Sequence, residues 1–189
     1  MKRLGVCYYP ELYPDNKRQE FMAEDIRLMK EAGFSVVRMA EFCWCLMEPE
    51  EGMYEFDWLE EYVNLLGENG IYTILCTPTA CQPVWMAEKY PSTLYVDNYG
   101  VQRSYGGRHY HCYNDPIFRK FTIDICREMG KRFGNNPYVI GWQVDNEMAQ
   151  EHSGRCQCPT CTALFQDYLR ETFHNDIHEL NEEFVSLFW

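Results

Sequence analysis

The feature that most restricts the fold is an alternation, repeated four times, of a short apolar run and a stretch with helical spacing. The runs favour strands, and the longer stretches repeat apolar residues every three or four positions. The expected strands are residues 4–9, 35–40, 72–77 and 138–146. The expected helices are residues 16–33, 57–70, 83–90, 116–133, 162–173 and 176–184. Such alternation predicts an α/β protein in which helices cover a parallel sheet.

Polar residues follow the predicted strands, and their position favours a closed barrel over an open sheet. Glu11 comes after the first strand, Glu41 after the second, and Asn146 with Glu147 after the fourth. In (β/α)8 TIM barrels the carboxyl ends of the strands build the active site. The first strand also lacks the glycine-rich phosphate loop of nucleotide-binding sheets. We therefore expect strand–helix units of a TIM barrel.

The length of the chain predicts only part of such a barrel. A complete barrel takes about 250 residues, whereas this chain has 189 and holds four strand–helix units. Ending there would leave a sheet edge open, which proteins usually cover or close. We expect residues 1–189 to be the N-terminal half of the barrel domain, without its remaining strands or any later domain.

The composition restricts the partners and the compartment. The formal net charge is −12, so we expect neither nucleic acid nor an anionic membrane surface as a partner. Aromatic residues are 16% of the chain, which suits neutral sugars. No apolar run is long enough for a signal peptide or a membrane span. Ten cysteines without such a signal indicate a reducing compartment, and we expect the cytoplasm.

The dipeptide Asn146–Glu147 at the end of the fourth strand is the first candidate for catalysis. Hydrolysis of a glycosidic bond needs a proton for the leaving oxygen, and a carboxylic acid of raised pKa delivers it. Burial in an aromatic-walled pocket would raise the pKa of Glu147. Asn146 could hydrogen-bond a sugar hydroxyl. The alternative is that both residues are ordinary loop residues that cap the next helix, and the dipeptide alone does not decide between the two.

Three cysteines in the run RCQCPTC are the first candidate for a metal site. Thiolates so close in sequence can bind Zn²⁺ when a fourth ligand comes from elsewhere. We predict a structural zinc site formed by Cys112, Cys156, Cys158 and Cys161. The competing fourth ligands are His109, His111 and His152, and the alternative is a set of free thiols. Four thiolates leave no open position, so a catalytic metal is not expected.

For several other residues near the strand ends, the sequence allows both a functional and a structural role. Arg108 either donates to sugar hydroxyls or holds a carboxylate in place, or it forms only a surface salt bridge. Trp44 and Trp85 are sugar-stacking platforms or parts of the core. Glu11 and Glu41 either line the pocket or cap helices. A separate group of cysteines is expected to be small buried hydrophobes: Cys7, Cys76 and Cys126.

Taken in order, several motifs resemble glycoside hydrolase family 42, the microbial β-galactosidases. The resemblance runs through essentially the whole chain, and the motifs are specific together although each is weak alone. They are GVCYYPELYP, VVRMAEFCWCLMEPEEGMYEFDWL, TPTACQPVWM, GGRHYHCYNDPIFR, GWQVDNE, CQCPTC, LNEEF and the terminal FW.

The resemblance implies a (β/α)8 barrel that hydrolyses terminal β-D-galactose residues with retention. By position, Glu147 matches the family's acid/base, and Asn146 and Arg108 match its substrate-binding residues. The four cysteines named above match its structural zinc site. The family's nucleophilic glutamate and the later domains, including the one used for a homotrimer, match nothing in this chain. We therefore expect the isolated chain to be inactive.

Two interpretations from other classes remain beside this one. The first is an inactive, zinc-stabilised carbohydrate-binding fragment, which the same cysteines and aromatic residues would suit. The second is a zinc-ribbon protein that binds nucleic acid. It rests on the cysteines alone, and the charge of −12 opposes it.

Overall fold

A parallel sheet with its strands in chain order forms the centre of the protein. The computed structural model describes residues 3–14, 16–148 and 155–186. Within them the sheet has the order β1-β2-β3-β4, and all three strand pairs are parallel, as predicted. The strands are β1 (Gly5–Cys7), β2 (Val36–Met39), β3 (Tyr72–Cys76) and β4 (Val139–Gln143). They end earlier than expected, and Ala40, directly after β2, already has a positive φ of 81°.

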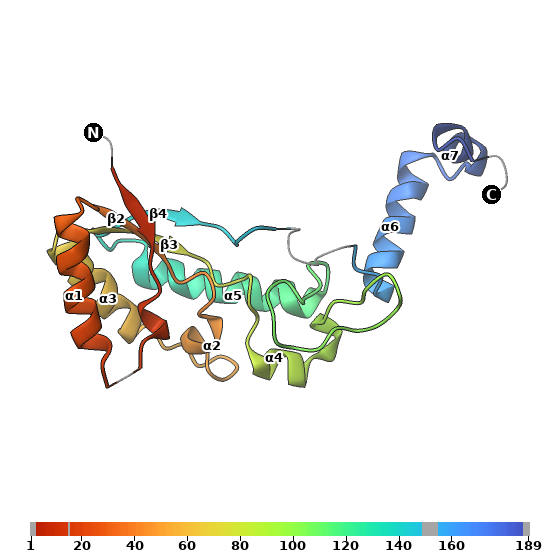
Figure 1. The fold of residues 1–189 in the computed structure, drawn as a ribbon. Helices are drawn as coiled ribbons and strands as arrows, with labels where there is room; N and C mark the ends of the chain where they lie inside the picture. Colours follow the sequence, from red (N-terminus) through yellow and green to blue (C-terminus); the bar gives the residue numbers. More distant parts are fainter. Residues whose placement is uncertain (1–2, 15, 149–154, 187–189) are drawn as a thin grey trace.

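The helices lie on one side of this sheet or beyond it. They are α1 (Arg18–Glu31), α2 (Trp44–Met47), α3 (Asp57–Glu68), α4 (Val84–Lys89), α5 (Pro116–Phe133), α6 (Pro159–Thr172) and α7 (Ile177–Glu183). Two 3-10 turns are η1 (Pro10–Leu12) and η2 (Pro91–Thr93). In Figure 1, α1, α3 and α5 cover one face of the sheet, whereas α6 and α7 extend away from it.

The core fills the space between the sheet and α1, α3 and α5. Val37 and Met39 alternate along β2, so both point to the same face, and both are fully buried. Leu59 from α3 and Ile125 from α5 are fully buried in the same cluster. Burying one such side chain stabilises the fold by about 1.5–3 kcal/mol. This packing gives the sheet a fixed base from which its loops project.

The opposite face of the sheet is more polar and less covered. Arg38 lies between the core residues of β2 and therefore points to this other face. Gln143, at the end of β4, hydrogen-bonds Arg38 and so lies on the same face. Within the described residues no helix covers this face (Figure 1). The open face of the sheet thus carries polar side chains toward the strand ends.

Strand β1 is exposed along its whole length, and this corrects one prediction about the cysteines. Cys7, expected to be buried, is exposed because it lies on an edge strand that no other described strand pairs on its outer side. Cys76 on the inner strand β3 is buried as expected, and Cys126 on α5 is half-buried.

Four of the six predicted helices begin one to three residues away from their predicted starts. Helix α3 begins at Asp57, the first residue of its predicted range, and Phe56 occupies the cap position without a side-chain hydrogen bond. Helix α6 begins at Pro159, because the Cys158 sulfur accepts a hydrogen bond from the N–H of Cys161 and proline suits a first turn. The short α2 was not predicted, whereas α5 has its predicted bounds.

The long connection between α4 and α5 is folded rather than irregular. Two isolated antiparallel bridges cross it, Leu94 with His111 and Val96 with Gln102. The N–H of Cys112 also donates to the carbonyl of Thr93 over 2.7 Å. These bonds fix the segment that carries Arg108 and Cys112 beside the carboxyl ends of the strands.

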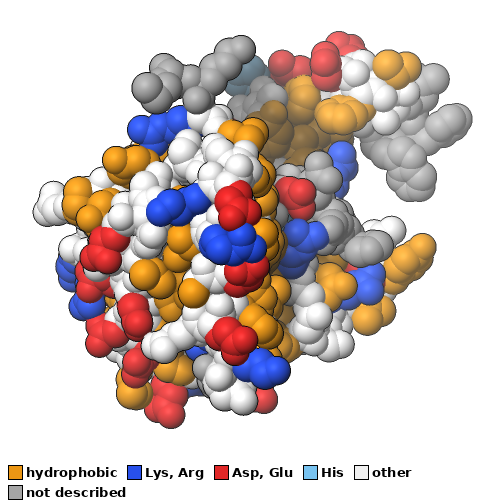
Figure 2. Space-filling view, turned by 60° about the vertical axis from the view of Figure 1, so that its left-hand side comes forward, with side chains coloured by type: hydrophobic (Ala, Val, Ile, Leu, Met, Phe, Trp, Pro, Cys, Tyr) orange, Lys and Arg blue, Asp and Glu red, His pale blue; other side chains and the backbone are white. Residues whose placement is uncertain are grey.

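The surface over the N-terminal units has a mixed charge. On the face drawn in Figure 2, acidic and basic side chains are interspersed among apolar ones. A search of the described helices found none that is both long enough and apolar enough to cross a bilayer.

Candidate active site and cysteine cluster

The loop after β4 places Asp145 and Glu147, on either side of Asn146, in an unusual backbone conformation. Asp145 and Glu147 have positive φ values of 58° and 49°, a region that non-glycine residues rarely occupy and that concentrates at functional sites. The loop is anchored because the N–H of Asp145 donates to the hydroxyl of Thr77 over 2.8 Å. Thr77 follows β3, so the ends of β3 and β4 together shape this turn.

Asn146, in the middle of this loop, is buried, and its amide oxygen accepts a hydrogen bond. Only 6% of the residue is exposed. Its N–H donates to Oδ1 of Asp145 over 2.7 Å. The Gln143 amide nitrogen donates both to the Asp145 carbonyl, at 2.9 Å, and to Oδ1 of Asn146, at 3.1 Å. The side chain of Asn146 is thus oriented from below by β4.

Glu147 meets Arg108, which lies 39 positions earlier in the chain. Nη1 of Arg108 is 3.2 Å from Oε2 of Glu147, and the Glu147 side chain is 51% exposed. The Arg108 guanidinium also lies 5.2 Å from the centre of the Phe42 ring. Arg108 and Glu147, both candidates from the sequence, therefore form an ion pair. Glu147 is not buried among the described residues, although the sequence predicted that it would be.

Glu41 lies inside the structure and does not cap a helix. It is fully buried, and its Oε1 accepts hydrogen bonds from Tyr9 and Arg38, each over 2.6 Å. Burial and the hydrogen bond to Glu41 raise the pKa of Tyr9 to about 12, so the phenol remains a donor at neutral pH. The helix-capping interpretation of Glu41 is therefore not supported, and the fully buried carboxylate serves as an internal hydrogen-bond acceptor.

Glu11 lies in η1, directly after β1, and accepts a hydrogen bond from a thiol. The Cys43 sulfur donates to its Oε1 over 2.9 Å. Burial raises the pKa of the Glu11 carboxyl, and the bond from Cys43 opposes that shift. Glu11 therefore belongs to the contact between the first two units, away from Glu147.

The two tryptophans are structural. Trp44 is fully buried and donates to Oε2 of Glu48 over 2.8 Å. Trp85 donates to the carbonyl of Glu48 over 2.8 Å and packs edge-on against Phe121. Both indoles have protein partners, which favours the core interpretation over a sugar-stacking platform.

Four cysteines come together as the sequence predicts. The sulfurs of Cys112, Cys156, Cys158 and Cys161 all lie within 4.8 Å of one another. Cys112 is 3.6 Å from Cys158 and 3.4 Å from Cys161, measured between sulfurs. This cluster could bind a metal ion, and it joins the segment before α5 to the start of α6.

The competing histidines do not join the cluster within the described residues. His109 Nδ1 is 2.6 Å from the Tyr113 hydroxyl, and His111 stacks on Phe118 at 4.0 Å between ring centres. His152, the third competitor, lies outside the described residues. Among the described residues, Cys112 is therefore the fourth member of the cluster.

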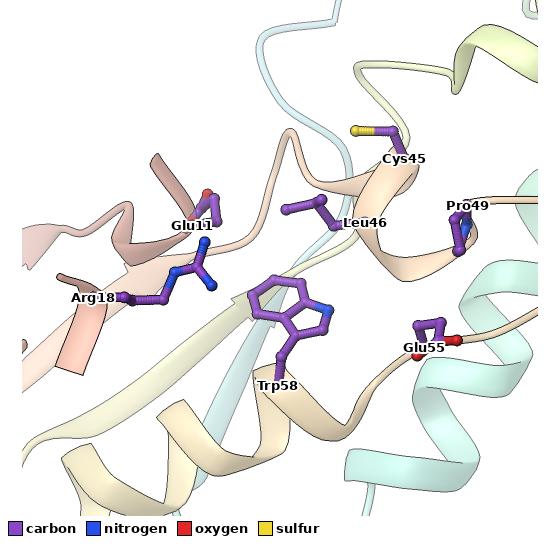
Figure 3. A pocket seen from close by; sticks show the side chains of 7 residues that line it. All are labelled: Glu11, Arg18, Cys45, Leu46, Pro49, Glu55 and Trp58. Carbon is purple, nitrogen blue, oxygen red and sulfur yellow. The ribbon is translucent and has the colours of Figure 1, made fainter. Parts of the chain in front are cut away.

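A cavity of about 320 Å³ lies between the first two units, apart from the predicted catalytic residues (Figure 3). The Trp58 indole forms its base, with Glu11 and Arg18 on one side and Leu46 facing them. The residues that line it are Glu11, Arg18, Cys45, Leu46, Pro49, Glu55 and Trp58. None of Arg108, Asn146 and Glu147 lines this cavity, so it is separate from the candidate catalytic residues.

The sequence analysis missed Tyr9, Arg38 and Gln143, which support the site from below. The signal for two of them was present, because Arg38 and Gln143 are polar residues inside otherwise apolar predicted strands. By alternation, such a residue points away from the neighbouring core positions and toward the barrel interior. Their contact with each other was not predictable, because 105 positions separate them.

Comparisons with known proteins cover nearly the whole chain. The glycoside hydrolase 42 family, described as β-galactosidase, matches residues 7–189. A β-galactosidase of Clostridium perfringens is 42% identical over 98% of this chain and 26% of its own length. One of Thermus thermophilus is 41% identical over 98% of this chain and 28% of its own length.

A solved structure agrees with these relatives. The β-galactosidase of the Antarctic haloarchaeon Halorubrum lacusprofundi has a TM-score of 0.89 at 39% identity, over 100% of this chain and 27% of that one. The chain thus spans about a quarter of the relatives that it matches. Together with the parallel sheet, this confirms the predicted fold class, the N-terminal portion of a (β/α)8 barrel.

Proposed function

The chain belongs to glycoside hydrolase family 42, and from this membership we propose that it carries the acid/base half of a β-galactosidase site. The reaction is the hydrolysis of terminal, non-reducing β-D-galactose residues in β-galactosides. The observation that supports this best is the meeting of Arg108, Asn146 and Glu147 at the carboxyl end of β4. In barrels of this kind, catalytic residues come from that end of the strands.

Each of the three residues has a role that its chemistry suits. Glu147 gives a proton to the leaving oxygen and later takes one from the attacking water. Arg108, whose Nη1 is 3.2 Å from Glu147 Oε2, holds that carboxyl group and donates to sugar hydroxyls. Asn146 hydrogen-bonds the sugar beside the scissile bond, where such bonds strengthen in the transition state.

The retaining mechanism needs a second carboxylate, and we assign it to residues outside this chain. The two carboxyl groups of a retaining enzyme stand about 5–5.5 Å apart, and the second attacks the anomeric carbon. Glu11 and Glu41 are engaged by Cys43 and by Tyr9 with Arg38, respectively. We therefore propose that residues 1–189 are a partial barrel domain and that a longer parent supplies the nucleophile and the remaining strands.

The four-cysteine cluster is proposed to bind a structural Zn²⁺. Zinc bound by four thiolates at about 2.3 Å would place sulfurs about 3.8 Å apart in a tetrahedron. The sulfur–sulfur distances of 3.4 and 3.6 Å from Cys112 are close to that value, and all four sulfurs lie within 4.8 Å of one another. The ion would supply a cross-link between the two loops, and four protein ligands leave no position for substrate.

The partner is proposed to be a neutral galactoside, in agreement with a net charge of −12 that disfavours nucleic acid and anionic membranes. From the family resemblance we also propose a homotrimeric parent in the cytoplasm.

The test uses a chimera in which this chain replaces the matching 26% of the Clostridium perfringens enzyme. We expect Glu147→Gln to lower kcat on lactose by about 10²–10⁴-fold, because the leaving oxygen loses its proton donor. The loss on 4-nitrophenyl β-D-galactopyranoside is expected to be smaller, because a good leaving group needs less acid assistance.

The matched control is Glu61→Gln, which removes one exposed carboxylate on α3 and is expected to leave both rates unchanged. Full lactose hydrolysis by the Glu147→Gln chimera would reject the assigned role. The isolated chain is expected to show no turnover. Galactose binding by the chain together with an inactive unsubstituted chimera would instead favour the carbohydrate-binding fragment.

A further inference from the structure

A line of hydrogen bonds crosses the open face of the sheet and ends beneath the proposed sugar-binding amide. It begins at Tyr9, which donates to the buried carboxylate of Glu41 over 2.6 Å. Arg38 donates from Nη2 to the same oxygen over 2.6 Å and from Nη1 to Oε1 of Gln143 over 2.9 Å. Gln143 then donates to Asn146. Arg38 belongs to β2 and Gln143 to β4, and Tyr9 follows β1, so residues from three strand–loop segments form this line.

The line has a fixed direction. A guanidinium can only donate hydrogen bonds, so the atom of Gln143 that faces Arg38 must be its oxygen. The amide nitrogen of Gln143 then points the other way, and it reaches both the Asp145 carbonyl and Oδ1 of Asn146. Because that oxygen accepts from Gln143, the nitrogen of the Asn146 amide points the other way and can donate its N–H groups to a ligand.

We propose that Gln143 is a positioning residue that fixes Asn146 as a hydrogen-bond donor to a substrate hydroxyl oxygen. The inference rests on the proposed role of Asn146 in sugar binding. Arg38 and Glu41 act one step further back, because they determine which end of the Gln143 amide faces the loop. A rotation of the Asn146 amide by 180° would bring two donors together at 3.1 Å, which Gln143 prevents.

Gln143→Glu separates positioning from simple packing. The introduced carboxylate has nearly the same shape and still accepts from Arg38, but it has no donor for Asn146. The Asn146 amide should then turn, giving an N–H to the carboxylate and presenting its oxygen to the site. Gln143→Met keeps a comparable length without any strong hydrogen bond, and Gln19→Met, on the exposed surface of α1, is the matched control.

The first measurement is made on the ¹⁵N-labelled 189-residue chain. The side-chain NH₂ signals of Asn146 are identified by their loss in Asn146→Ser. In Gln143→Glu we expect one Asn146 side-chain proton to move downfield and to exchange more slowly, and in Gln143→Met or Gln19→Met we expect no such change. Identical Asn146 signals in the native chain and in Gln143→Glu would overturn the proposal.

The second measurement is a double-mutant cycle in the chimera, and it does not depend on the isolated chain being well ordered. Gln143→Glu is expected to lower kcat/KM on lactose about 10- to 100-fold, the range for a misdirected hydrogen bond. In an Asn146→Ala background the same substitution should cost less than about 2-fold, since coupled residues are not additive. Equal losses in both backgrounds would overturn the proposal.

The two measurements also distinguish this inference from the proposed function. An unsubstituted chimera without galactosidase activity would reject the proposed function, while the NMR comparison would still decide whether Gln143 orients Asn146. A chimera that is active but shows additive losses would reject the positioning role alone.

Discussion

The sheet with its covering helices and the pair α6–α7 are built in opposite ways. Helices α1, α3 and α5 each bury several side chains against the sheet. Helices α6 and α7 bury none among the described residues, and Figure 1 shows them extending from the body. Helix α6 instead begins at the four-cysteine cluster. Apolar burial thus holds the first region, whereas a few polar and sulfur contacts at one end hold the second.

Metal removal should have the largest effect, and the loss of ordered structure should be confined to the second region. Structural zinc in zinc-finger peptides binds with about 10–16 kcal/mol of apparent free energy, and α6 has no core to replace it. We expect chelation, or Cys158→Ser, to abolish hydrogen-exchange protection in α6 while the amides of β2 and β3 remain protected. One zinc per chain in the native protein, by elemental analysis, is the accompanying control.

Simultaneous loss of protection in the sheet and in α6 would contradict this prediction, because it would mean that the cluster holds the whole chain together. Unchanged protection of α6 after verified removal of the metal would also contradict it, because α6 would then be held by contacts other than the cluster.

A core substitution should have the next largest effect. Leu59 of α3 is fully buried in the main cluster. We expect Leu59→Ala to lower the free energy of unfolding of the body by about 2–5 kcal/mol, from lost burial and the cavity left behind. Urea denaturation followed by circular dichroism measures it, and zinc content should stay at the native value.

A leucine-to-alanine substitution on α6 should have the smallest effect of the three. Leu164 is 47% exposed, and surface substitutions usually change stability by less than about 0.5 kcal/mol. We expect Leu164→Ala to leave the urea midpoint of the body unchanged. A cost similar to that of Leu59→Ala would show that another surface covers α6 in solution.

Local patterns in the sequence predicted some elements well because the determinants are short-range. The bounds of α5 follow from its own residues: Asp115 caps the N-H groups of Ile117 and Phe118, Pro116 suits the first turn, and Gly134 follows the end. The order of the parallel strands follows from strand–helix alternation, since each crossover returns the chain to the next position in the sheet.

The support of the candidate site was harder to predict because it depends on contacts between distant residues. Glu147 was a candidate from its place at a strand end and Arg108 from its place in a long loop, but no local pattern indicated that these two side chains meet at 3.2 Å. The bond between Arg38 and Gln143 depends on the twist and register of three strands. The exposed Glu147 side chain likewise differs from the burial that a strand end alone suggested.

The cysteine cluster has a consequence for the unfolded chain as well as for α6. Cys112 and Cys158 are 46 positions apart, and the segment between them contains α5, β4 and the loop with Asn146 and Glu147. A metal that retained these ligands would close that segment into a ring and reduce its conformational freedom before folding. For a covalent ring of this size, the chain-entropy estimate is about 4 kcal/mol. Such a ring would therefore restrict the unfolded chain most between Cys112 and Cys158, the segment that carries the proposed acid/base Glu147.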